Sequence, residues 1–225
     1  MYETETNRKD TSMEQQTYNM PRLNEPAPDF TVKTTHGDLT LSDLKGQWVV
    51  LFSHPADFTP VCTTEFIAFA ERNEKFEERN AKVIGLSIDS IYSHLAWVRN
   101  IKDNFGVEIP FPIIEDLKMD VARKYGMIHP GAADTSAVRA VFIIDDKGIM
   151  RAMVYYPLTN GRSIDEILRV LIALQTSQEN ACATPENWQP GDQVIVPPPA
   201  TQEAAAKRQS EGYEYTDWYF SKKSL

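Results

Sequence analysis

Cysteine is scarce in this chain, since its 225 residues include only Cys62 and Cys182. Two cysteines are too few for the disulfide framework of a small secreted domain, and they favour a reducing, cytoplasmic location. The sequence also lacks metal-ligand spacings such as Cys-x-x-Cys or His-Glu-x-x-His around its four histidines. We therefore expect neither a metal site nor a cofactor.

Long apolar runs and basic tracts are missing as well. No stretch of about 18 consecutive apolar residues occurs, so no membrane span is expected. The net charge of −9 and the pI near 5.0 argue against nucleic acid or an anionic membrane surface as a partner. Residues 1–22 are polar and lack the apolar core of a signal peptide, so we predict a flexible N-terminal extension.

The most informative stretch is Trp48–Glu65, which reads WVVLFSHPADFTPVCTTE. Its apolar first part predicts a strand buried on both faces, and this strand ends before Pro55 because proline cannot continue a ladder. A helix is predicted to follow, since Thr59 is a good N-cap and Pro60 suits the first helical position. An amphipathic pattern extends this predicted helix to about residue 79.

Cys62 falls in the first turn of that helix. The unpaired backbone N–H groups and the positive end of the helix dipole there favour a thiolate over a thiol. Beside a cation, the pKa of such a cysteine can fall from about 8.5 to roughly 3.5–7.5. Thr59 lies three positions earlier on the same face, so its hydroxyl could reach the sulfur or a bound substrate oxygen. A free cysteine is more often a small buried hydrophobe, and the surrounding motif decides between the two interpretations.

Strand and helix patterns alternate over residues 23–178, which predicts an α/β domain with a mixed central sheet and a thioredoxin-like order of elements. Ser90 is predicted to cap a helix whose apolar stripe includes Ile91, Leu95, either Trp97 or Val98, and Ile101. The capping box of Ser163 and Glu166 begins the last helix. Strands are predicted over 31–35, 82–89, 111–115, 138–145 and 149–155, the first of them at an edge, with a short helix over 121–125.

The composition changes in residues 179–225, which we predict to be a C-terminal dimerisation arm. The segment contains the run Val-Pro-Pro-Pro and a cluster of aromatic residues that need burial. Such aromatic residues on a long arm are expected to pack on a neighbouring subunit, which predicts a homodimer. The aromatic cluster consists of Tyr213, Tyr215, Trp218, Tyr219 and Phe220.

The stretch from His54 to Glu65 resembles the active-site loop of the peroxiredoxins, and specifically of their one-cysteine branch. The spacing of Pro55, Thr59 and Cys62 fits the proline, threonine and cysteine motif of that family, and the similarity continues through the C-terminal arm. The resemblance implies a thioredoxin-like fold and a thiol-dependent peroxidase that reduces hydrogen peroxide and organic hydroperoxides in antioxidant defence. It also implies that the arm wraps over a dimer partner and that dimers can form ring decamers.

The same resemblance implies roles for individual residues. Cys62 would attack the hydroperoxide and become a sulfenic acid, and Pro55 would shape the loop and shield the sulfur. The substrate pocket would be bordered by His54, Val61 and Glu65. For His54 a satisfied core histidine is the alternative, and Glu65 would either orient the arginines of the site or cap the helix.

Arg139 stands in an otherwise apolar predicted strand, where a lone charge is costly unless it has a partner. An ion pair with a carboxylate is one interpretation. The resemblance implies the other, in which Arg139 lies beside the thiolate and binds a peroxide oxygen.

Cys182 has two possible roles. It could be a resolving thiol that condenses with the sulfenic acid of Cys62, or an incidental cysteine at the start of the arm. Some similar archaeal proteins carry a cysteine where this chain has Ser221, and that difference favours one-cysteine chemistry. The partner would then be an external thiol reductant, such as a thioredoxin-like protein or glutathione.

Two other functions remain alternatives at this point. A thioredoxin-like disulfide oxidoreductase is disfavoured because Thr59 and Glu65 occupy the positions where Cys-x-x-Cys would place a second cysteine. An oligomeric chaperone-like holdase is suggested by the aromatic arm.

Overall fold

The computed structural model describes residues 20–129, 131 and 136–225, so nearly all of the predicted N-terminal extension lies outside the described residues. Seven strands form one mixed sheet in the order β2-β1-β5-β4-β3-β6-β7. The central pairs β3/β4 and β4/β5 are parallel, and the other pairs are antiparallel. The strands are β1 (Thr31–Thr34), β2 (Gly37–Thr40), β3 (Trp48–Ser53), β4 (Ala81–Ser87), β5 (Ile113–Glu115), β6 (Arg139–Ile144) and β7 (Met150–Tyr156).

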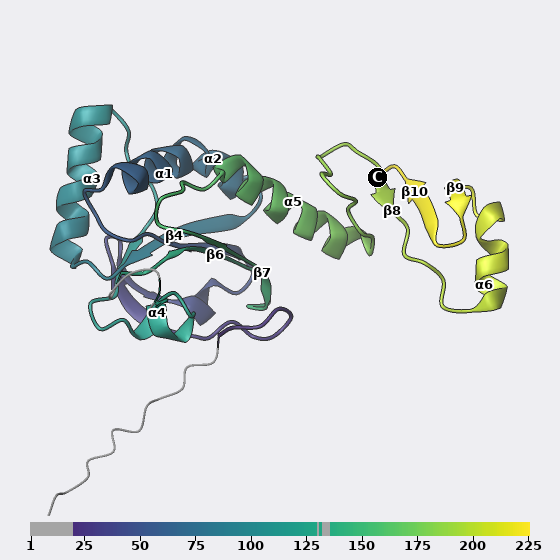
Figure 1. Cartoon of the computed structure of the whole chain (residues 1–225), viewed down its shortest axis with the longest axis horizontal. Coiled ribbons are helices and arrows are strands. Elements are labelled where there is room, and N and C mark those ends of the chain that lie inside the picture. The colour runs from purple at the N-terminus through teal and green to yellow at the C-terminus, as the bar shows by residue number, and fades with distance from the viewer. Residues whose placement is uncertain (1–19, 130, 132–135) are drawn as a thin grey trace, which may run out of the picture.

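Helices cover both faces of this sheet, which confirms the predicted α/β class (Figure 1). Four helices lie on one face, and α4 lies on the other beside the short 3-10 helix η1 (Leu41–Leu44). None of the helices in the described part of the chain is long and apolar enough to span a bilayer. The helices are α1 (Pro60–Glu71), α2 (Asn73–Glu77), α3 (Ile91–Phe105), α4 (Asp120–Lys124) and α5 (Ile164–Asn180).

Strand β3 divides the core, because successive side chains of a strand point to opposite faces. Val50 and Phe52 pack under α1, α3 and α5, whereas Val49 and Leu51 pack towards α4 and η1. All six residues of β3 are buried, as its uninterrupted apolar run predicts. The strand delivers the chain to the loop before α1 from the centre of the sheet.

Three local predictions are corrected by the structure. The helix expected to reach residue 79 is interrupted at Arg72, so α1 and α2 are separate. Strand β1 is internal, and β2 forms the edge. The buried stripe of α3 contains His94 with Trp97 and Ile101, while Leu95 remains 41% exposed. A histidine therefore occupies a core position that the apolar pattern assigned to a leucine.

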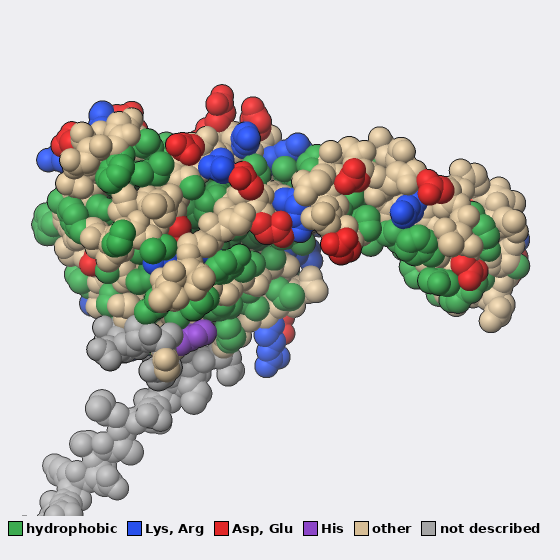
Figure 2. Space-filling model, turned by 45° about the horizontal axis from the view of Figure 1, so that its top comes forward, with side chains coloured by type: hydrophobic (Ala, Val, Ile, Leu, Met, Phe, Trp, Pro, Cys, Tyr) green, Lys and Arg blue, Asp and Glu red, His purple; other side chains and the backbone are tan. Residues whose placement is uncertain are grey.

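The C-terminal segment extends away from the domain from the end of α5 (Figure 1). Helix α5 continues to Asn180 and so includes the first two residues of the predicted arm. The arm contains a small sheet in the order β8-β10-β9, and its aromatic residues remain partly exposed, Trp218 by 45% and Tyr219 by 55%. Hydrophobic side chains are visible on the surface of the arm in Figure 2. Its elements are β8 (Val194–Ile195), α6 (Gln202–Lys207), the 3-10 helix η2 (Arg208–Ser210), β9 (Glu214–Asp217) and β10 (Phe220–Lys223).

Candidate active site

Cys62 is the third residue of α1, in the first turn, as predicted. Its side chain has no exposed surface and packs with the aromatic core below the helix. The Sγ atom accepts a hydrogen bond of 3.3 Å from Nη1 of Arg139. The sulfur therefore has a guanidinium beside it as well as the amino end of a helix, two features that both favour negative charge.

Arg139 begins β6 and contacts both the carboxylate of one interpretation and the sulfur of the other. Its Nη1 donates to Oε2 of Glu65 at 2.8 Å as well as to the sulfur, and its Nε donates to the carbonyl of Leu158 at 2.9 Å. Arg139 is 3% exposed and Glu65 is 2% exposed. The ion pair thus fixes the guanidinium in the orientation that reaches Cys62.

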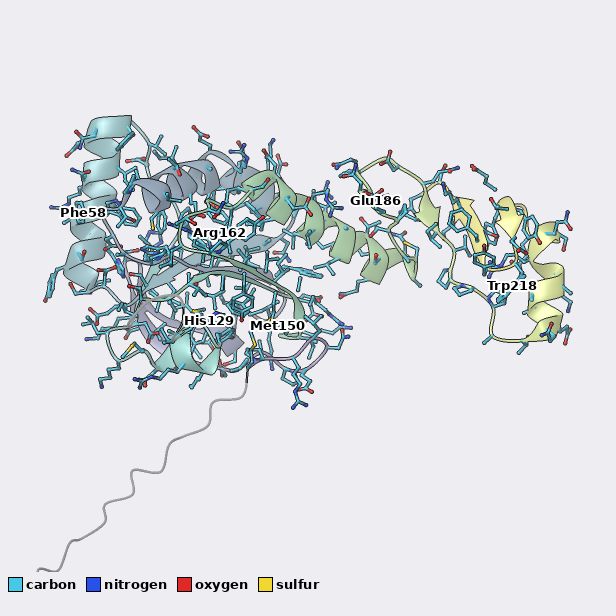
Figure 3. The ribbon with its side chains drawn as sticks, in the orientation of Figure 1. Phe58, His129, Met150, Arg162, Glu186 and Trp218 are labelled. Carbon is cyan, nitrogen blue, oxygen red and sulfur yellow. The ribbon has the colours of Figure 1, made fainter. Side chains whose placement is uncertain are left out.

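Arg162 is a second arginine of the site, and no local pattern in the sequence indicated it. Its Nε donates to Oε1 of Glu65 at 2.9 Å, and its Nη2 donates to Oε2 at 2.7 Å. Its Nη1 donates to the carbonyls of Ser53 and Ala140, at 2.9 and 2.8 Å. Figure 3 shows Arg162 between the helices and the sheet, where it joins α1 to the ends of β3 and β6.

Glu65 is therefore the centre of a buried Arg139–Glu65–Arg162 cluster. Burial alone would raise the pKa of this carboxyl, but the hydrogen bonds and the charge of Arg162, with the charge of Arg139, lower the pKa below its ordinary value. Glu65 orients the arginines, which was one of its two predicted roles.

Thr59 occupies the N-cap position of α1, but its side chain makes no capping hydrogen bond to the described helix. Its Oγ1 instead donates to the carbonyl of Ala56 at 2.9 Å and closes a turn within the loop. Thr59 is thus the N-cap residue, as predicted, although its side chain does not bond to the helix. The hydroxyl can rotate about its own bond, so it remains available to a substrate oxygen.

The residues predicted to border the substrate pocket differ in burial. Pro55 and Val61 are half-buried, whereas His54 has no exposed surface. The ring of His54 lies against Phe66 and Trp97, with centroids 4.8 and 5.2 Å apart. His54 is thus buried in the core, where its Nδ1 atom has no hydrogen-bond partner among the described residues, and its place at the border of the substrate pocket stays a prediction.

His54 belongs to a polar cluster that the sequence did not predict. Its Nε2 lies 2.8 Å from Oδ1 of Asp57, and Nδ1 of His94 lies 2.8 Å from Oδ2 of the same carboxylate. Within the described residues, His54, Asp57 and His94 form the one group of three side chains that could together bind a metal ion, with their ligand atoms within 4.8 Å of one another. Their distances are those of hydrogen bonds, which account for the cluster without an ion.

Cys182 lies at the far end of α5 from the active site. Its side chain is 9% exposed and packs with Ala173, Trp188 and Val194 in a cluster separate from the core around Cys62. Arg162, which contacts the site, precedes α5, whereas Cys182 follows it. A helix of 17 residues is about 26 Å long at 1.5 Å per residue. The two sulfurs of one chain are therefore too far apart for a disulfide in this conformation.

Two family models match this chain. The AhpC/TSA family model matches residues 23–153, and the model of the C-terminal domain of 1-Cys peroxiredoxin matches residues 173–212. A peroxiredoxin of Aquifex aeolicus is 59% identical over 217 residues, which cover 92% of this chain and 98% of that protein. A peroxiredoxin of Methanosarcina mazei is 51% identical, over 89% of this chain and 96% of that protein.

Solved structures show the same relationship. A yeast mitochondrial 1-Cys peroxiredoxin, studied for thiol resolution via the glutathione/thioredoxin systems, superposes with a TM-score of 0.81 and 40% identity, covering 92% of this chain and 100% of the other. Peroxiredoxin 6 of Arenicola marina gives a TM-score of 0.82 at 37% identity, covering 90% of this chain and 97% of that one. The fold, the family models and these relatives agree with the Cys62 motif. The chain therefore belongs to the AhpC/TSA family, as a thiol-dependent peroxidase of the one-cysteine peroxiredoxin branch.

Proposed function

We propose that Cys62 is the nucleophile of this peroxidase. The thiolate attacks the terminal oxygen of a hydroperoxide, an S–O bond forms as the O–O bond breaks, and the other oxygen leaves with a proton as water or an alcohol. Cys62 is oxidised to a sulfenic acid in this step. The observation that carries the proposal is the hydrogen bond of 3.3 Å from Arg139 to Sγ, on a sulfur at the amino end of α1.

Three groups stabilise the charge that develops on the peroxide oxygens. They are the guanidinium of Arg139, the hydroxyl of Thr59 and the backbone N–H of Cys62, and their positions before the reaction lower the cost of reorganisation. Pro55 and Val61, half-buried and close to Cys62 in the sequence, limit the size of the substrate. His54 and Glu65 act through their neighbours, because both are buried and hydrogen-bonded within the protein.

An external thiol completes the cycle. Its thiolate attacks the sulfenic sulfur to give a mixed disulfide and water, and a second thiol then releases reduced Cys62. The position of Cys182 beyond α5 supports this scheme over resolution within one chain. Glutathione and thioredoxin are the reductants we propose, since the related yeast protein is resolved via these systems.

We propose a homodimer formed through the C-terminal arm, with a ring of dimers as its higher assembly. The partly exposed aromatic residues of residues 179–225 support this proposal, since such a surface is stabilised by burial against another protein. We also propose that the chain consists of an N-terminal extension over 1–22, a peroxidase domain over 23–178 and this arm. Two free thiols favour a cytoplasmic setting.

The test compares Cys62→Ser with Cys182→Ser in a peroxide consumption assay with a thiol reductant. Cys62→Ser should abolish turnover, whereas Cys182→Ser should keep it. Turnover that survives Cys62→Ser would reject the assignment. Insulin reduction and suppression of aggregation, measured on the same two variants, separate the peroxidase from a disulfide oxidoreductase and a holdase.

A further inference from the structure

The loop that carries the peroxidase motif contains a buried carboxylate with several hydrogen-bond partners. Asp57 is 7% exposed and lies between His54 at the end of β3 and His94 on α3, with 2.8 Å to each ring. The backbone N–H of Asp57 donates to Oδ2 of Asp89 at 3.0 Å. Asp57 thus links the loop to His54 directly after β3, to Asp89 after β4 and to His94 on α3.

The hydrogen bonds of His94 define its protonation state. Its Nε2 lies 3.1 Å from the carbonyl of Ile114, and its Nδ1 faces Oδ2 of Asp57. A carbonyl and a carboxylate only accept, so both ring nitrogens must carry a proton. The contact between His94 and Asp57 is therefore a buried ion pair.

The other two groups of the cluster are consistent with this assignment. Burial alone would raise the pKa of Asp57, but hydrogen bonds from His54 and His94 lower that pKa well below its usual range, so the carboxylate is ionised. Burial lowers the pKa of His54, which is therefore neutral and donates from Nε2. The ion pair therefore consists of one positive charge on His94 and one negative charge on Asp57.

The next residue of the loop is strained. Phe58 has φ +54°, a left-handed conformation that is unfavourable for a bulky L-residue. Its side chain is 55% exposed and lies at the surface near α3 (Figure 3), so burial does little to offset the strain. Such strain persists only where neighbouring contacts hold it, and the adjacent buried contact is Asp57.

Access to the sulfur requires this loop to move. Cys62 has no exposed surface, and a thiol such as glutathione or a protein reductant is far larger than a peroxide. The reductant must bring its own sulfur into line with the sulfenic sulfur of Cys62. Because the segment 54–62 ends at the buried Cys62, we infer that its opening exposes the sulfur before the mixed disulfide forms.

We propose that the Asp57–His94 ion pair is a clamp that holds the strained loop closed and sets how readily oxidised Cys62 meets an external thiol. This inference rests on the proposed role of Cys62 as the nucleophile. Asp57 and His94 are then positioning residues. The closed loop keeps Cys62 beside Arg139 for reaction with peroxide, and strain at Phe58 favours the open loop that the reductant needs.

The clamp and the strain predict opposite effects in different variants. Asp57→Asn and His94→Gln remove the ion pair and should increase the open population. Phe58→Asn should decrease it, because asparagine tolerates the left-handed conformation. Asp116→Asn is the matched control, since Asp116 is a buried carboxylate that accepts from the backbone N–H groups of Val121 and Ala122 at the start of α4.

All variants are made with Cys182→Ser, so that Cys62 is the single reporting thiol. Stopped-flow measurements give the rate constants of oxidation by hydrogen peroxide and of reduction by glutathione and by thioredoxin. In Asp57→Asn and His94→Gln, reduction should be about 5- to 30-fold faster while oxidation is slower. In Phe58→Asn, the thiols should reduce oxidised Cys62 more slowly than in the parent. Asp116→Asn should match the parent in the rate constants of both oxidation and reduction.

Hydrogen exchange of peptides that span 54–66 measures opening directly, whether or not Cys62 reacts with peroxide. Faster exchange there in Asp57→Asn and His94→Gln, with no change in Asp116→Asn, is the expected result. Unchanged exchange, or oxidation and reduction that both fall in equal proportion, would overturn the clamp. A parent protein that forms no sulfenic acid at Cys62 would instead refute the proposed nucleophile, and the exchange data would still decide about the clamp.

Discussion

Nη1 of Arg139 donates to two acceptors at once, Sγ of Cys62 at 3.3 Å and Oε2 of Glu65 at 2.8 Å. The contact with the Glu65 carboxylate orients the guanidinium so that Nη1 also reaches the Cys62 sulfur. In the proposed reaction, a peroxide oxygen beside Sγ would meet a hydrogen-bond donor that is already oriented and buried. The arrangement explains why an arginine is tolerated at the start of an otherwise apolar strand.

Arg139→Lys should lower the rate of Cys62 oxidation by peroxide by about 100-fold or more, the effect of losing one preorganised donor. Lysine keeps the positive charge but cannot reproduce the fork that reaches Cys62, Glu65 and the carbonyl of Leu158 together. Competition with a second peroxidase measures the rate constant. Lys147→Arg exchanges one basic side chain for another at an exposed turn and is the control. Equal rate constants in Arg139→Lys and the parent would contradict the role of Arg139 in the oxidation of Cys62.

Arg162→Ala should destabilise the fold by about 3–5 kcal/mol, because it leaves Arg139 as the remaining cation beside the buried carboxylate of Glu65 and removes the side-chain donor of two carbonyls. Arg162→Lys should recover only part of this loss, since lysine cannot bind both oxygens of Glu65 and both carbonyls. Urea unfolding measures the free energy. Arg169→Ala removes an arginine from a more exposed pair with Glu166 and should cost less than about 1 kcal/mol. Comparable losses in Arg162→Ala and Arg169→Ala would show that the buried cluster contributes little.

The parts of this site that the sequence predicted are those with local causes. The burial of β3, the start of α1 at Pro60 and the place of Cys62 in its first turn all follow from neighbouring residues. Arg162 and His94 were missed because their contacts join distant parts of the chain. Arg162 contacts a residue 97 positions away, and His94 contacts one 37 positions away. Nothing in the pattern of α3 distinguishes a buried histidine that pairs with Asp57 from a surface one.

Glu65 predicts how stability depends on pH. Its pKa in the folded state is below the ordinary value of 4.5, mainly because hydrogen bonds from Arg162 outweigh the effect of burial. The carboxylate therefore contributes stability that is present above about pH 4.5 and is lost as the pH falls through the lower folded pKa. The difference in free energy of unfolding between the parent and Glu65→Gln should thus be largest near neutral pH and shrink below pH 4.5. A constant difference across this range would contradict the ionised cluster.

Oxidation of the protein with one equivalent of peroxide should leave Cys62 as a sulfenic acid and Cys182 as a thiol. The two sulfurs lie at opposite ends of α5, so a disulfide within one chain cannot form without unfolding. Mass spectrometry after trapping with dimedone and alkylation distinguishes the products. Cys182→Ser should give the same Cys62 product at the same rate, and a peptide linked from Cys62 to Cys182 would support internal resolution instead.

The C-terminal arm should carry the dimer interface through its exposed aromatic residues. Trp218 and Tyr219 are 45% and 55% exposed, with ring centroids 5.6 Å apart, and form one apolar surface on a segment that extends from the domain. Truncation of both to alanine should weaken dimerisation about 10-fold or more, because large aromatic residues contribute most at interfaces. Sedimentation velocity over a range of concentrations measures the shift. Phe105→Ala, which removes an aromatic residue that is 57% exposed at the end of α3, should leave the dimer intact. A dimer that resists the double substitution but dissociates in Phe105→Ala would place the interface on the domain.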